Sequence, residues 1–162
     1  MEIPVRKSII NTQTQEPSIA HEATWMDLEQ LVSVELTSED NAYPIEGAFS
    51  LTAGTGWRAQ TSGEQTIRLR FDQPCNIRRI HLVFMEHERQ RTQEFILRWS
   101  TGEGDAYRDV VRQQYTFSPP GGNREVEDYL VELNGAKLLE LSIVPDISGS
   151  DVQASLQQML IA

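Results

Sequence analysis

The sequence is built largely from short runs in which apolar and polar residues alternate. In residues 65–71 the apolar side chains alternate with polar ones, and residues 76–84 and 94–100 repeat this pattern. Successive side chains of a strand point to opposite faces of a sheet, so each run predicts a strand with one buried face. We predict that the three runs share one core, formed by Ile67, Leu69, Phe71, Ile80, Leu82, Phe84, Phe95, Leu97 and Trp99.

Clusters of Gly, Pro, Asn and Asp separate the alternating runs and are typical of turns. Helical periodicity is confined to residues 22–31, where Thr24 is a candidate cap, and to a single turn near residues 48–51. Many short strands with one buried face predict an all-β fold, either a two-sheet antiparallel β-sandwich or a barrel. Five further strands, which bring the predicted number to eight, lie at residues 31–37, 107–117, 126–133, 137–144 and 155–161.

The length of 162 residues is that of one ordinary domain. Residues 1–21 are rich in Gln, Thr and Ser, a composition typical of a terminal arm. We therefore predict an N-terminal arm with a short helical turn over residues 1–30, followed by one β-domain over residues 31–162.

The chain is acidic, with 14 Lys and Arg against 24 Asp and Glu and a net charge of −10. This charge opposes non-specific attraction to nucleic acid and to anionic membranes, so neither is predicted as a partner. No apolar run approaches the roughly 20 residues that a membrane span needs. Residues 1–7 lack the apolar core of a signal peptide, which predicts a cytoplasmic protein. The single Cys75 has no partner for an internal disulfide.

Seven arginines lie within residues 65–101, against four acidic residues, so this part of the chain is locally basic. An arginine on the solvent face of a strand commonly pairs with an acid on the neighbouring strand, and this is our favoured interpretation. The alternative is a face that binds phosphate or acidic groups.

Residues 81–88 hold the one local concentration of histidine and carboxylate in the sequence. His81 and His87 share a side only if the strand continues through Glu88, whereas a zinc site of the HExxH type needs a helix. Cys75 follows Pro74 at the entrance to a strand, which is typical of a small buried residue rather than an activated thiolate. We therefore predict no metal site, no catalytic nucleophile and no enzymatic activity.

Several segments, taken in order, form a recognisable pattern. Residues 48–59 hold Ala and Phe followed by Thr55-Gly56-Trp57. Residues 64–74 and 77–82 form a strand, a polar turn and a strand. Residues 154–159, near the end of the chain, supply a closing strand. This order resembles that of discoidin domains, also called coagulation factor 5/8 type C domains, and of the related family 32 carbohydrate-binding modules. The resemblance implies a galactose-binding-domain-like fold, an eight-stranded antiparallel jelly roll over residues 31–162.

Many members of this family hold a structural calcium ion, with an Asp where Ser50 stands here and a Glu where Gln158 stands. Calcium is bound by about six to eight oxygen ligands, carboxylates among them. The loss of both charges argues against a calcium site, and we expect no other cofactor.

Sugar-binding members of the family hold their ligand with loops at one end of the jelly roll, where an aromatic ring and Arg, His and Asn donors contact the sugar. The corresponding loops here are residues 38–44, 85–93 and 117–123. The resemblance therefore implies a non-catalytic module that binds a carbohydrate, either rich in hydroxyls or acidic. The alternative is a protein–protein interaction domain of a cytoplasmic complex. The candidate ligand-binding residues are Tyr43, Arg58, His87, Arg89, Arg91, Phe117 and Asn123.

Overall fold

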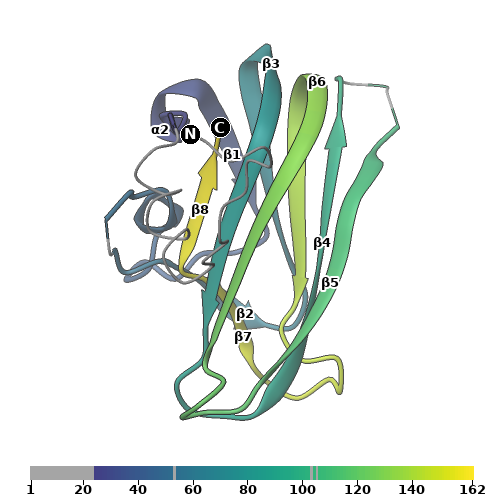
Figure 1. Ribbon diagram of the computed structural model, residues 1–162. Coiled ribbons are helices and arrows are strands. Elements are labelled where there is room, and N and C mark those ends of the chain that lie inside the picture. Colours follow the sequence, from purple (N-terminus) through teal and green to yellow (C-terminus); the bar gives the residue numbers. More distant parts are fainter. Residues whose placement is uncertain (1–23, 53, 103, 105) are drawn as a thin grey trace, which may run out of the picture.

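The computed structural model describes residues 24–52, 54–102, 104 and 106–162. Two strands of 21 residues each organise it, β3 (Gln65–Met85) and β6 (Arg124–Val144). They pair antiparallel, beginning with Gln65 opposite Ile143. The register shifts on both sides of Cys75, and the two ribbons bend over together at this end of the molecule (Figure 1). Each of the two strands therefore contributes to both layers of the fold.

The other strands complete two layers around β3 and β6. The large layer has the order β1-β3-β6-β4-β5 and uses the first half of β3 and the last part of β6. The small layer uses the second half of β3, which pairs with the first half of β6 and with β8. The added strands are β1 (Val32–Leu36), β4 (Arg91–Ser100), β5 (Arg108–Phe117) and β8 (Gln158–Ile161). The result is the predicted antiparallel β-sandwich.

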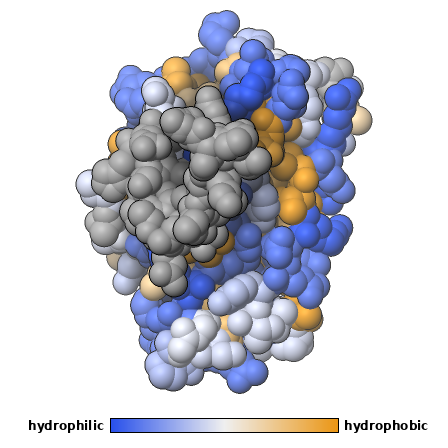
Figure 2. Space-filling view, viewed as in Figure 1, coloured by the Kyte–Doolittle hydropathy of each residue, from blue (hydrophilic) through white to orange (hydrophobic). Residues whose placement is uncertain are grey.

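The core lies between the two layers and contains the nine apolar side chains that the alternation predicts, none of them more than 8% exposed. The bend in β3 turns its two alternating runs toward each other, so both bury their apolar sides in the same cluster. Trp57 joins this core with 1% exposure. Hydrophilic residues cover most of the described surface that is visible in Figure 2, as expected where the opposite side of each strand meets solvent.

A separate two-stranded sheet lies toward the end opposite the bend (Figure 1). It pairs β2 (Trp57–Ser62) with β7 (Gln153–Leu156). The alternation did not predict β2, because only its first and third side chains, Trp57 and Ala59, are buried. This short sheet forms one wall of the pocket described below.

The predicted single strand at residues 155–161 is wrong, because two strands in different sheets occupy this segment. The break falls at Gln157, whose backbone N–H donates to the Val83 carbonyl at 2.8 Å. Its side-chain amide donates to the Gly54 carbonyl, also at 2.8 Å. These bonds redirect the chain from β7 to β8, and nothing in the local alternation marks that change.

The described residues form two short helical segments, α2 (Leu28–Leu31) and η1 (Ile45–Ala48). The helix predicted over residues 22–31 is therefore shorter, and Asp27 rather than Thr24 precedes it. Leu28 is 3% exposed and belongs to the core. The predicted arm lies mostly outside the described residues. Among the described helices, none has the length and apolar character needed to cross a membrane.

Candidate functional site

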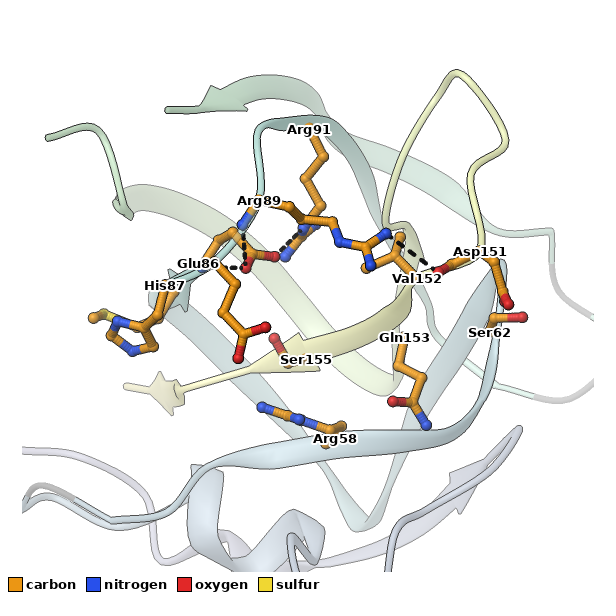
Figure 3. A pocket seen from close by; sticks show the side chains of 12 residues that line it. Arg58, Ser62, Glu86, His87, Arg89, Arg91, Asp151, Val152, Gln153 and Ser155 are labelled. Atoms are coloured by element: carbon orange, nitrogen blue, oxygen red, sulfur yellow. Dashed lines mark hydrogen bonds and ion pairs between the residues drawn. The ribbon is translucent and has the colours of Figure 1, made fainter. Parts of the chain in front are cut away.

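A pocket of about 400 Å³ opens at the end of the sandwich opposite the bend (Figure 3). Its walls come from β2, from β7 with the residues before it, and from the loop that joins β3 to β4. Met85 and Val152 are the apolar residues among those that line it, and the others are polar or charged. No aromatic side chain among the described residues lines this pocket. Such a lining is suited to a hydrophilic ligand.

Arg91 supports the pocket from within the protein. Its side chain is 1% exposed, and its Nε donates to Glu86 Oε1 at 2.6 Å. Its Nη1 donates to the Pro145 carbonyl at 2.6 Å, and its guanidinium lies 4.7 Å from the centre of the Phe117 ring. Because its Nε and Nη1 are engaged, Arg91 holds the β3–β4 loop in place. It has no pair of parallel N–H donors left to bind a ligand.

Glu86 transmits this support to the loop that lines the pocket. Its second oxygen, Oε2, accepts the backbone N–H groups of Glu88 at 2.9 Å and of Arg89 at 3.2 Å. Partial burial opposes ionisation, but Arg91 and the two N–H groups outweigh it and lower the pKa of Glu86. Glu86 is therefore a stable anion that fixes the backbone carrying His87 and Arg89.

Arg58 and Arg89 present cationic groups from opposite walls of the pocket (Figure 3). The guanidinium of Arg58 lies 4.7 Å from the centre of the Tyr43 ring, and its backbone N–H donates to the Tyr43 carbonyl at 3.1 Å. Arg89 Nη1 donates to the Asp151 carbonyl at 3.3 Å. Both arginines are exposed, and neither has a carboxylate within ion-pair distance in the described part of the chain.

The structure brings four of the seven predicted ligand residues to the pocket wall: Arg58, His87, Arg89 and Arg91. Tyr43 lies behind Arg58, as its contact with that guanidinium shows. The expectation for Phe117 is wrong, because this ring is fully buried and cannot be an exposed platform for a sugar. The reason is its inward position at the end of β5, where Arg91 packs against it.

Asn123 does not line the pocket, although its backbone carbonyl accepts the Glu86 N–H at 2.8 Å. Sequence reasoning also missed the polar residues Gln153 and Ser155 of β7 and Asp151 before it. Within β7, Ala154 and Leu156 are buried while their neighbours are not, so the alternation there could have identified the pocket-facing side.

A buried polar chain continues inward from Arg91. Arg91 Nη1 donates to Gln93 Oε1 at 3.3 Å, and Gln93 Nε2 donates to Glu125 Oε1 at 3.2 Å. Glu125 is 2% exposed. Burial, with the nearby carboxylate of Glu127 as a second cause, raises the pKa of Glu125 to about 9. At neutral pH Glu125 is therefore a neutral acid beneath the pocket.

The two positions at which the family resemblance implies calcium ligands lie close together. Gln158 Nε2 donates to the Ser50 carbonyl at 2.9 Å, which ties the early loop to β8 through a neutral amide. Within the described ranges, no group of three His, Cys, Asp or Glu side chains is arranged to hold a metal ion. The absence of calcium binding stays a prediction, supported by the direct bond between these two residues.

No protein-family model matches the sequence, and no curated protein matches it significantly. Solved structures with a similar fold include the family 32 module of NanJ from Clostridium perfringens in complex with galactose. This similarity has a TM-score of 0.63 and 12% identity, and it covers 85% of this chain and 97% of that one.

The family 32 module of AlyQ, in complex with 4,5-unsaturated mannuronic acid, gives a TM-score of 0.61 at 16% identity, over 86% of this chain and 98% of that one. A further Clostridium perfringens module, in complex with GalNAc-β-1,3-galactose, gives a TM-score of 0.62 at 14% identity, over 85% and 99% of the two chains. The chain therefore shares the antiparallel β-sandwich fold of these modules, the fold that the order of its sequence segments implied.

Proposed function

We propose that this protein is a non-catalytic carbohydrate-binding module and that the pocket between β2, β7 and the β3–β4 loop holds the sugar. The observation that carries the proposal is the pair of exposed arginines, Arg58 and Arg89, on opposite walls of a polar pocket, neither of them in an ion pair with another described residue. The fold supports it, because similar structures are carbohydrate-binding modules with bound sugars.

The chemistry of the wall suits hydroxyl groups and a carboxylate. The guanidinium groups of Arg58 and Arg89 can each donate two parallel hydrogen bonds, and bonds to a carboxylate are about twice as strong as neutral ones. His87, Gln153 and Ser155 add donors and acceptors for hydroxyls. A uronic acid residue, which carries both groups, is the sugar that this lining fits best.

The state of Glu86, one of the carboxylates that line the pocket, supports a binding role over a catalytic one. A glycosidase needs one carboxylic acid that keeps its proton and a second carboxylate across the scissile bond. Glu86 is tied to Arg91 and has a lowered pKa, so it does not supply the proton of a general acid.

Isothermal titration calorimetry with galactose, N-acetylgalactosamine and oligogalacturonate tests the proposal. We expect oligogalacturonate to bind more tightly than the neutral sugars, and the double variant Arg58→Ala, Arg89→Ala to lose that binding. Arg112→Ala is the matched control, because Arg112 lies on β5, away from the pocket, and pairs with Glu94 at 3.1 Å. Equal binding by the double variant and the wild type would overturn the assignment of the pocket.

A protein–protein interaction domain is the second candidate. One observation favours it: no aromatic ring among the described residues lines the pocket, whereas aromatic rings commonly cover the apolar face of a sugar. Failure of every tested sugar to bind the wild type would shift the balance to this candidate.

A further inference from the structure

The edge strand β1 is less well covered than the strand beside it. The side chains of Val32, Val34 and Leu36 face the core side of the large layer but are only half-buried. Their partners on β3, which include Leu69 and Phe71, are at most 1% exposed. Apolar surface therefore remains accessible along this edge.

A groove of about 360 Å³ lies along β1 and shares no lining residue with the pocket described above. It is bounded by β1, α2 and η1. Its apolar lining consists of Leu28, Val32, Val34, Leu36, Ile45 and Phe49. A groove of this kind accepts apolar side chains that project from a partner at alternate positions.

The polar residues of the groove are all acidic. Glu29, Glu39 and Glu46 line it, and no Lys, Arg or His among the described residues does. Glu39 accepts the Ile45 N–H at 2.7 Å, but none of the three has an ion-pair partner in the described part of the chain. On the outer face of the large layer, by contrast, Glu35 pairs with Arg68 at 3.0 Å. The groove therefore has unmatched negative charge.

The backbone of β1 adds a third feature. Among the described strands β1 pairs only with β3, so its other edge carries no strand. The Thr37 N–H donates to the Thr66 carbonyl at 3.1 Å. Because backbone groups alternate between the two edges of an antiparallel strand, Val34 and Leu36 direct theirs to the free edge. The same residues therefore offer both hydrogen bonds and an apolar lining.

We propose that the free edge of β1 and the groove beside it bind an extended basic peptide segment of a partner protein. The segment adds a strand to the large layer, places alternate apolar side chains in the groove, and directs Lys or Arg side chains to Glu29, Glu39 and Glu46. Main-chain hydrogen bonds supply affinity in this mode, and the groove with its charge supplies specificity.

Selection from a phage-displayed library of random nonapeptides on the full-length chain tests this proposal. We expect the selected peptides to alternate apolar residues with Lys or Arg. Glu29 and Glu46 are exposed, so the double variant Glu29→Lys, Glu46→Lys should keep its fold and bind these peptides about tenfold more weakly. N-methylation of alternate peptide amides should abolish binding, because it removes the donors of the added strand.

Three results would overturn the proposal. The first is that no peptide is selected, or that the charge-reversed variant binds the peptides as well as the wild type does. The second is that Arg58→Ala with Arg89→Ala also loses the peptides, which would place them in the sugar pocket. The third is a dimer in sedimentation that the charge-reversed variant lacks, which would make a second copy of the chain the occupant.

Discussion

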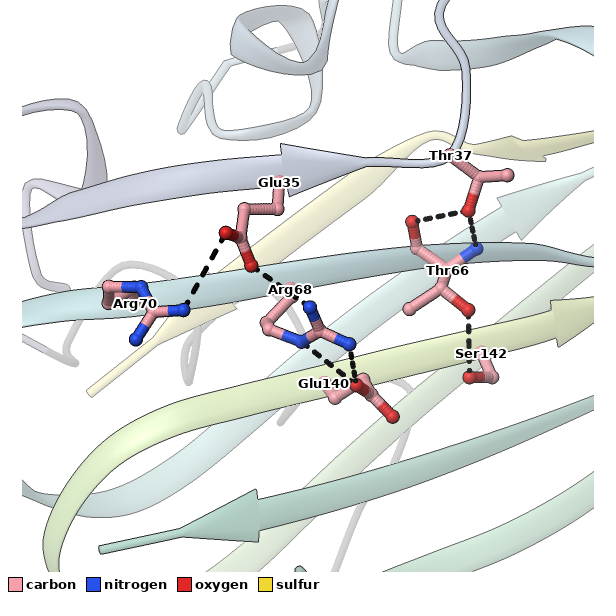
Figure 4. A network of polar contacts seen from close by, with 7 residues as sticks. All are labelled: Glu35, Thr37, Thr66, Arg68, Arg70, Glu140 and Ser142. Atoms are coloured by element: carbon pink, nitrogen blue, oxygen red, sulfur yellow. Dashed lines mark hydrogen bonds and ion pairs between the residues drawn. The ribbon is translucent and has the colours of Figure 1, made fainter. Parts of the chain in front are cut away.

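The arginines on the outer face of the large layer and those at the pocket have the same chemistry but different partners. On the face, Arg68 lies between Glu35 at 3.0 Å and Glu140 at 2.8 Å, and Arg70 reaches the same Glu35 at 3.6 Å (Figure 4). Register places Arg68 directly opposite both Glu35 and Glu140, whereas Arg70 lies opposite Ser33 and Leu138 and reaches Glu35 diagonally. These cations are matched within the fold.

At the pocket, one arginine is buried and paired, while two are exposed and have no acidic partner among the residues that the structure describes. Arg91 is 1% exposed and paired with Glu86, whereas Arg58 stacks on Tyr43 and Arg89 donates to the backbone carbonyl of Asp151. The difference shows that a nearby carboxylate determines the role of an arginine. An arginine that has such a partner stabilises the fold, and one that lacks it is accessible to a ligand.

Arg91→Ala should have the largest effect. Removal of one member of a buried ion pair leaves the other charge uncompensated and costs about 3–5 kcal/mol. The Pro145 carbonyl loses its donor as well. Denaturant unfolding measures the change, with Arg89→Ala as the control two residues away. A loss below about 1 kcal/mol would contradict the supporting role of Arg91.

Glu125→Gln tests a buried acid that forms no ion pair within the described part of the chain. The pKa of Glu125 is raised from 4.5 to about 9, so between these values the folded state keeps a proton that the unfolded state has lost. Stability of the wild type should therefore fall as the pH rises through this window. Glutamine mimics the neutral acid and should make the protein more stable by about 1–3 kcal/mol near pH 8.

Unfolding measured between about pH 5 and pH 9 checks this expectation, since stability changes across the window in which proton uptake differs. The curves of wild type and Glu125→Gln should diverge as the pH rises and lie closest near the acidic end. Parallel curves would show that Glu125 is ionised in the folded protein.

Arg68→Ala should have a smaller effect, because its side chain is 36% exposed and solvent screens its ion pairs. We expect a loss of about 1 kcal/mol, which salt should reduce. Thermal unfolding at low and high ionic strength is the measurement. A loss as large as that of Arg91→Ala would remove the distinction between the outer face and the pocket.

Arg58→Ala and Arg89→Ala should change stability least among the arginine variants, by less than about 0.5 kcal/mol each. Both side chains are exposed, and neither holds an ion pair among the described residues. Melting curves recorded with the calorimetric titrations check this point. A clear loss of stability in either variant would assign that arginine to the fold.

Calcium should have the smallest effect of all. The amide of Gln158 binds the Ser50 carbonyl directly, so neutral groups join the early loop to β8 where the family resemblance implies charged ligands. We expect equal melting temperatures in millimolar calcium and in chelator. A shift of more than about 2 °C would show that other oxygens of the loop recruit the ion.

The sequence by itself determined the core and most of the strands, except β2 and the division of residues 155–161 between β7 and β8. Alternation of apolar and polar residues is a local property with a period of two, so Ile67, Leu82 and Leu97 were assigned to the core without knowledge of any pairing. It also indicated that strand arginines would meet acids, which holds for Arg68, Arg70, Arg79 and Arg98.

Only the tertiary structure decided which arginines are free and where the pocket lies. Arg58, Arg89 and Ser155 come from three distant segments, and their convergence depends on how β2, β7 and the β3–β4 loop meet. Phe117 and Arg91 were expected at a ligand, but the packing of β5 against β4 buries both. Burial and ion pairing depend on contacts between strands far apart in the chain, and a pattern with a period of two does not encode those contacts.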